Sequence, residues 1–137
     1  MKPYYDHAGI QIFHADCREI LPTLAPGSVD LVLTDPPYEA EAHTLGRRAR
    51  RIGGGEYFDV RPVGFEAIDE PTRLTTGGEM ARIGNGWILV FCQVEAAMLW
   101  RDALVPARYT RTQIWRKPNG APQFTGDRPG MGYESIV

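Results

Sequence analysis

Short apolar runs separated by polar turns predict that strands and helices alternate along this chain. Residues 10–13 and 29–34 are the first expected strands, and residues 18–24 between them carry apolar positions on one side, as an amphipathic helix does. The run at 29–34 is apolar enough for a strand that is covered on both faces. The order strand, helix, strand predicts a parallel unit of an α/β fold.

The second half of the chain continues this alternation. A helix is expected within residues 65–83, interrupted by Pro71 and by Gly77-Gly78 and ended by the glycines that follow it. The elements expected after this helix are a strand at 87–92, an amphipathic helix at 94–104 that Pro106 stops, an alternating strand at 109–115 and the start of another strand at 132–137.

Two segments lack any such period. Residues 39–62 contain a cluster of four arginines followed by Gly53-Gly54-Gly55, so we expect a mobile loop there. Residues 117–131 are rich in proline and glycine and are expected to form a second loop. The four clustered arginines are Arg47, Arg48, Arg50 and Arg51.

The size of the chain fits one domain over residues 1–137, long enough to bury a core. No apolar run approaches the ~20 residues of a membrane span, and none has the form of a signal peptide. Cys17 and Cys92 stand far apart in apolar contexts, so we expect reduced core thiols of a cytoplasmic protein. The histidines are scattered, which argues against a metal site.

The charge of the chain bears on whether it binds nucleic acid. The formal net charge of −2 is unlike that of a basic DNA-binding domain. Locally, the arginine cluster is able to neutralise phosphates, and a solvated loop is the equal alternative. Lys117 and Asn119 begin the second loop and are a further candidate DNA contact, with residues 117–131 as the segment that carries it.

The tetrapeptide Asp35-Pro36-Pro37-Tyr38 follows the expected strand at 29–34 directly. Two prolines fix φ and remove two backbone donors, so the strand must stop there with Asp35 extended. The stiff corner presents one carboxylate, a free carbonyl at Pro36 and one aromatic face. Such a set suits a flat heterocycle that bears an amino group, because two acceptors can take both amino protons and free the nitrogen lone pair. A strand-ending turn without chemistry is the alternative.

The nine residues at 30–38, Asp-Leu-Val-Leu-Thr-Asp-Pro-Pro-Tyr, resemble the amino-group DNA methyltransferases, which methylate adenine N6 or cytosine N4 from S-adenosylmethionine. Weaker similarity follows at 86–91, 114–119 and 132–134, so the resemblance covers about residues 10–38 and 86–137. It implies a Rossmann-like methyltransferase fold with a mostly parallel sheet. It also implies catalytic roles for Asp35, Pro36, Pro37 and Tyr38, with the base stacked on Tyr38 after extrusion from double-stranded DNA.

Asp16 closes the first expected strand, and parallel strands end at one sheet edge, where ligands of such sheets bind. In the resembled family an acidic residue at this place contacts the cofactor adenine, which implies that Asp16, Cys17 and Asp35 bind S-adenosylmethionine. The alternative for Asp16 is an N-cap of the following helix, and one residue can do both.

The chain departs from the family in one respect. Those enzymes carry a Phe-x-Gly-x-Gly loop that wraps the methionine part of the cofactor, and no such segment is found here. In the circularly ordered (beta-type) group with an early Asp-Pro-Pro-Tyr, that loop lies near the C-terminus. We therefore expect a fold that is incomplete there, weak or absent cofactor binding, and an exposed sheet edge that favours a homodimer.

The resulting hypothesis is a cytoplasmic DNA methyltransferase of bacterial or phage origin, of the restriction-modification type, that acts on adenine N6. The alternatives are an N4-cytosine, RNA or protein-amide methyltransferase. A non-catalytic remnant that binds DNA or a protein partner is the other class. Affinity for the cofactor separates the enzyme from the remnant.

Overall fold

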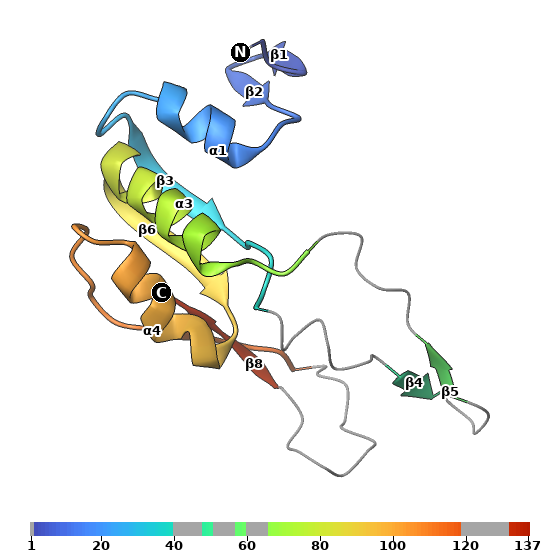
Figure 1. The fold of residues 1–137 in the computed structure, drawn as a ribbon. Coiled ribbons are helices and arrows are strands. Elements are labelled where there is room, and N and C mark those ends of the chain that lie inside the picture. The colour runs from blue at the N-terminus through green and yellow to red at the C-terminus, as the bar shows by residue number, and fades with distance from the viewer. Residues whose placement is uncertain (1, 40–47, 51–56, 60–65, 119–131) are drawn as a thin grey trace.

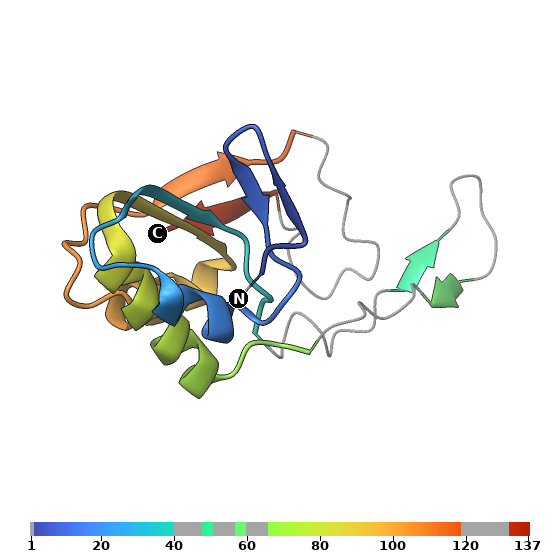
Figure 2. The same ribbon diagram turned by 90° about the horizontal axis from the view of Figure 1, so that it is seen from above.

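The computed structural model describes residues 2–39, 48–50, 57–59, 66–118 and 132–137. Its centre is a four-stranded sheet in the order β3-β6-β8-β7, and the helices lie on one side of it (Figures 1 and 2). The strands are β3 (Val29–Thr34), β6 (Gly84–Cys92), β7 (Gln113–Arg116) and β8 (Tyr133–Ile136).

The sheet is mixed. β3 and β6 pair in parallel, with Thr34 beside Val90, whereas β8 is antiparallel to both β6 and β7. It follows that β3, β6 and β7 share one direction and that β8 alone runs against them. The described part of the chain therefore belongs to the α/β class. The expectation of a mostly parallel sheet holds only for β3 and β6, since two of the three pairings are antiparallel.

Helix α3 (Glu70–Ile83) connects to β6 without a loop. Asp69 caps its start by accepting a hydrogen bond from Thr72 N at 2.9 Å, and Pro71 sits in the first turn, where its missing N–H has no helical partner to lose. The helix runs through Gly77 and Gly78, so the expected interruption is wrong. A Cβ atom at Gly77 would lie 2.6 Å from the Ala103 carbonyl oxygen, so glycine permits the close approach of α3 to α4 (Ala97–Ala103).

The core lies between the sheet and these helices. Trp100 of α4 and Val90 and Cys92 of β6 are its largest fully buried side chains, and Met80 of α3 packs with them. β6 also approaches β3 closely at Gly86: a Cβ atom there would lie 2.1 Å from the Asp30 carbonyl oxygen of β3. A short 3-10 turn, η2 (Val94–Ala96), precedes α4, and β7 begins at Gln113 rather than at Tyr109 as expected.

The N-terminal strands form a separate hairpin, which corrects the expectation that residues 10–13 join the main sheet. β1 (Tyr5–His7) and β2 (Ile10–Ile12) pair antiparallel with each other. The turn between them contains Ala8 and Gly9, both at positive φ, as a tight hairpin turn requires. Every residue of both strands is exposed, so a local turn formed this pair without burying its apolar positions. Helix α1 (Cys17–Ile20) and the turn η1 (Leu21–Thr23) then lead to β3.

A second correction concerns residues 39–62, where no strand was expected. β4 (Arg48–Arg50) and β5 (Tyr57–Asp59) pair antiparallel in a two-stranded sheet. Strands of three residues are too short to leave a period in the sequence. The remainder of the expected loop lies outside the described residues. Within the described ranges, no helix is long and apolar enough to cross a membrane.

Candidate functional site

The Asp35–Tyr38 corner lies at the carboxyl edge of the sheet. β3 ends at Thr34, and the corner follows it beside the end of β6. Asp35 is exposed, whereas Pro36 and Tyr38 are half-buried. The Tyr38 carbonyl oxygen accepts a hydrogen bond of 3.1 Å from Ile68 N, which ties the corner to the segment that opens α3. The site is therefore held from two sides while its carboxylate faces solvent.

Tyr38 lies between two carboxylates. Burial raises the pKa of its hydroxyl well above its ordinary value, and the negative charges of Asp35 and Glu134 and hydrogen bonding to them raise it further. The side chain is therefore a neutral hydrogen-bond donor over the whole physiological pH range. Glu134 comes from β8, so the cluster joins the corner that follows β3 to the antiparallel strand on the other side of β6.

Lys117 balances part of this negative charge. Its ammonium group forms an ion pair with Glu134 and lies 5.3 Å from the centre of the Trp115 ring. Trp115 meets Phe91 edge-on, with ring centroids 5.7 Å apart. The carboxyl ends of β6 and β7 thus carry an aromatic surface next to the charged cluster, which suits a planar ligand.

A buried ion pair connects the corner to helix α3. Arg73 of α3 is only 6% exposed, and its guanidinium lies 3.3 Å from Glu39, the residue after Tyr38. Glu39 Oε2 and Arg73 Nε make no hydrogen bond with any described group. A charge this deeply buried requires its partner. The pair therefore fixes where the chain goes as it leaves the corner.

The two cysteines differ. Cys92 is fully buried, and burial, followed by the charges of Glu39 and Glu134, raises the pKa of its thiol to about 12. Cys17 is exposed at the start of α1, so the expectation of a core thiol is wrong there: the short helix turns this residue to solvent. Both thiols are free.

Asp16 caps helix α1. Its carboxylate accepts hydrogen bonds from Arg18 N at 2.8 Å and from the Arg18 guanidinium at 2.6 Å. These bonds lower the pKa of the Asp16 carboxyl to about 2. Arg18 also reaches Thr72 in the first turn of α3, and both views place the start of α1 toward the carboxyl end of β3 (Figures 1 and 2). The start of α1 thus lies toward the same end of β3 as the corner, and Arg18 occupies both carboxylate oxygens of Asp16.

Only some of the residues expected to contact DNA lie within the described ranges. Lys117 is half-buried and paired with Glu134, so its charge is already neutralised. Arg48 and Arg50 belong to β4. Arg47, Arg51 and Asn119 lie outside the described residues.

Three functional candidates escaped the sequence reasoning. Glu134 lay in a weak motif and received no role, and Glu39 stands directly after the motif, where its charge was the available signal. No sequence signal marked Arg73, because only its tertiary contact with Glu39 distinguishes it from the other helical arginines. Among the residues that the structure describes, no cluster of three His, Cys, Asp or Glu side chains could hold a metal ion.

Comparisons with known proteins give no relative from which to transfer a role. No protein-family model matches the chain. A search of curated proteins also finds no significant match.

Proposed function

We propose that this protein is an S-adenosylmethionine-dependent DNA methyltransferase that acts on the exocyclic amino group of an extruded base, with adenine N6 as the target. One observation carries the proposal. The Asp35-Pro36-Pro37-Tyr38 corner follows β3 directly at the carboxyl edge of the sheet, with Tyr38 set between Asp35 and Glu134. Open α/β sheets bind their ligands at this edge.

The corner matches the needs of amino methylation. The exposed Asp35 carboxylate would accept a hydrogen bond from one amino N–H and the Pro36 carbonyl would accept one from the other, which would leave the nitrogen lone pair less delocalised into the ring and more nucleophilic. The ring of Tyr38 offers a face on which the base stacks, and stacking offsets part of the few kcal/mol that extrusion costs. Glu134 contributes, after burial and Asp35, to the raised pKa of the Tyr38 hydroxyl, and Lys117 forms an ion pair with Glu134.

The fold supports the proposal to a limited degree. β3, β6 and β7 run in one direction, and α3 connects β3 to β6 in the manner of a parallel crossover unit. A Rossmann-like methyltransferase fold, in which β8 is the reversed strand, is compatible with this arrangement and forms part of the proposal.

The cofactor assignment rests on the resemblance, and the residues at the edge fit it in part. S-adenosylmethionine, when bound, supplies an electrophilic methyl group. Asp16, Cys17 and Asp35 are the residues that would hold it, and Asp16 and Cys17 are both exposed at the start of α1. Since Arg18 occupies both oxygens of Asp16, that carboxylate must exchange Arg18 for a cofactor group.

Double-stranded DNA is the proposed partner. Arg47, Arg48, Arg50 and Arg51 would neutralise phosphates, and Lys117 and Asn119 are the further candidate contacts to DNA. This electrostatic component is independent of sequence and falls with salt. Replacing the four clustered arginines by alanine is therefore expected to weaken binding to all DNA sequences alike.

Transfer of a tritiated methyl group from S-adenosylmethionine tests the proposal. Unmethylated DNA should become labelled, whereas RNA and unrelated protein should not. Asp35→Ala should abolish labelling without changing the circular dichroism spectrum. Asp30→Ala is the matched control, because Asp30 is an exposed carboxylate on the same strand, away from the corner. Equal rates in the Asp35→Ala variant and the wild type would remove the corner from the mechanism.

A further inference from the structure

The register of the sheet brings Glu134 to the edge where the Asp35–Tyr38 corner lies. β3 ends at Thr34, which lies beside Val90 of β6, and the corner follows it. On the other side of β6, Cys92 pairs with Ser135 of β8. Because β8 runs antiparallel to β6, Glu134 is the next residue of β8 toward this edge. The corner and Glu134 therefore flank the carboxyl end of β6 from opposite sides.

Glu134 is largely buried and firmly held. Only 12% of its side chain is exposed, and the Lys117 ammonium group pairs with its Oε1 atom. Lys117 N also donates a hydrogen bond of 2.8 Å to the Gly132 carbonyl oxygen, which fixes the start of β8 against the end of β7. Each oxygen of a carboxylate accepts hydrogen bonds of its own. The Oε2 atom of Glu134 is therefore an acceptor for a second donor.

The Tyr38 hydroxyl is that second donor. It lies between Asp35 and Glu134 and hydrogen-bonds with their side chains. A phenol has one proton to donate, and an ionised carboxylate only accepts, so the two carboxylates compete for the same hydroxyl. While Tyr38 donates to Asp35, that carboxylate is a weaker acceptor for any further donor. A half-buried hydroxyl without an acceptor is costly, so Asp35 becomes fully available only if another acceptor takes its place.

We propose that Glu134 is a positioning residue that accepts the hydrogen bond of the Tyr38 hydroxyl when the amino group of the base engages Asp35. The inference rests on the proposed function, because it requires an amino group at Asp35. The hydroxyl turns from one carboxylate to the other, the proton stays on Tyr38, and the ring stays in place for stacking. Lys117 holds Glu134 in position through the ion pair, a role that needs no contact with DNA.

Adenosine and purine riboside test the proposal, because they differ only in the exocyclic amino group. The backbone amide signal of residue 38, followed by nuclear magnetic resonance, gives the Kd of each nucleoside at the corner. The ratio of the two Kd values is the preference for the amino group. Glu134→Gln keeps the shape of the side chain but loses its charge, so the Tyr38 hydroxyl stays on Asp35. The preference for adenosine should fall by about tenfold.

A second substitution separates positioning from a merely structural role. Tyr38→Phe keeps the ring but removes the hydroxyl that competes for Asp35. In that background Glu134→Gln should no longer change the preference for adenosine. An equal loss with and without the Tyr38 hydroxyl would overturn the proposal, because a structural effect of Glu134 does not depend on that hydroxyl. Circular dichroism checks that each variant is folded.

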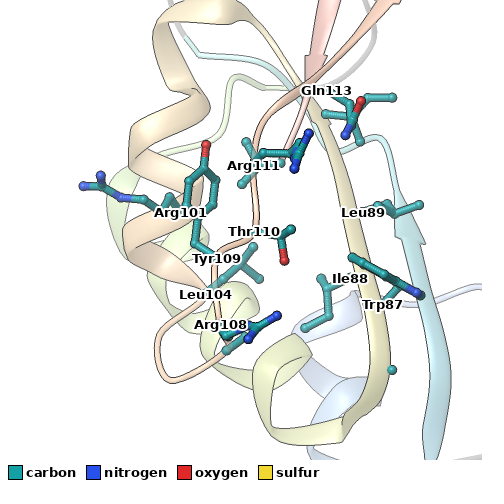
Figure 3. Close-up of a pocket in the computed structure, with 14 residues that line it drawn as sticks. Trp87, Ile88, Leu89, Arg101, Leu104, Arg108, Tyr109, Thr110, Arg111 and Gln113 are labelled. Carbon is teal, nitrogen blue, oxygen red and sulfur yellow. The ribbon is translucent and has the colours of Figure 1, made fainter.

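Asp102→Ala is the matched control. It also removes a carboxylate from an ion pair, that with Arg101, which borders the cleft beside the amino-terminal half of β6 (Figure 3). This variant should retain the full preference for adenosine. A wild-type preference that Glu134→Gln leaves unchanged would overturn the role of Glu134 alone. No preference for adenosine in the wild type would overturn the proposed function and this inference together.

Discussion

At the residue scale the site depends on how neighbouring charges act on single groups. Tyr38 is kept neutral by burial and by Asp35 and Glu134, while Asp16 is kept ionised by Arg18. One group is thereby a permanent donor and the other a permanent acceptor at neutral pH. The sequence identified Asp35 and Tyr38 as a corner, because proline geometry is local. It could not identify Glu134 as their companion, because that contact is made only after β8 docks.

The raised pKa of Tyr38 makes stability depend on alkaline pH. The unfolded chain ionises this tyrosine near its ordinary value of 10.0, whereas the folded chain retains the proton. The contribution is fully present below pH 10 and is lost as the pH rises toward the folded-state pKa. Tyr38→Phe should therefore lose less stability than the wild type between pH 8 and about 11, as measured by urea unfolding. Tyr133→Phe, at an exposed tyrosine, is the control, and parallel pH curves for wild type and Tyr38→Phe would refute the assignment.

At the element scale the packing of α3 decides the architecture. Its position is set by close approach to α4 at Gly77 and by the Arg73–Glu39 pair at its start. The sequence predicted α3 and β6 but expected Gly77-Gly78 to interrupt the helix. Tertiary contact overrides glycine's weak helix propensity there, since only a residue without Cβ fits against Ala103. The expectation for β2 was wrong for the opposite reason: a local hairpin turn pairs its backbone with β1, so β2 does not belong to the main sheet.

The two neighbouring glycines of α3 should respond to alanine in opposite directions. At Gly77 the added Cβ would lie 2.6 Å from the Ala103 carbonyl oxygen, so overpacking should cost about 1–3 kcal/mol of unfolding free energy. At Gly78 it would meet no atom within 4 Å, and alanine should stabilise the helix by about 0.5–1 kcal/mol. Urea titration of both variants decides this, and a Gly77→Ala variant as stable as Gly78→Ala would contradict the packing.

The ion pair between α3 and the corner should show strong coupling. Arg73→Met leaves Glu39 as a buried, unpaired charge and should lower the free energy of unfolding by about 3–5 kcal/mol. Adding Glu39→Gln removes that charge and should restore part of the lost free energy of unfolding. A double-mutant cycle by urea unfolding measures the effect. Strictly additive losses would mean that the two side chains do not stabilise each other.

At the scale of the whole molecule, the α/β class was predictable because each apolar run is local. The order of the strands and their directions were not predictable. β8 reverses the sheet between β6 and β7, and the hydrophobic pattern of a short strand does not encode its direction. The same reversal brings Glu134 and Lys117 to the carboxyl edge beside Tyr38. The candidate site is thus a product of the sheet topology as much as of the motif.

The central claim is that this edge methylates the amino group of a base. Nucleoside mass spectrometry tests it most directly: unmethylated DNA is incubated with the protein and millimolar S-adenosylmethionine, then digested and analysed. We expect N6-methyladenine with the wild type and with Asp30→Ala, and none with Asp35→Ala. No methylated nucleoside from any of the three proteins, or equal amounts from all of them, would contradict the account.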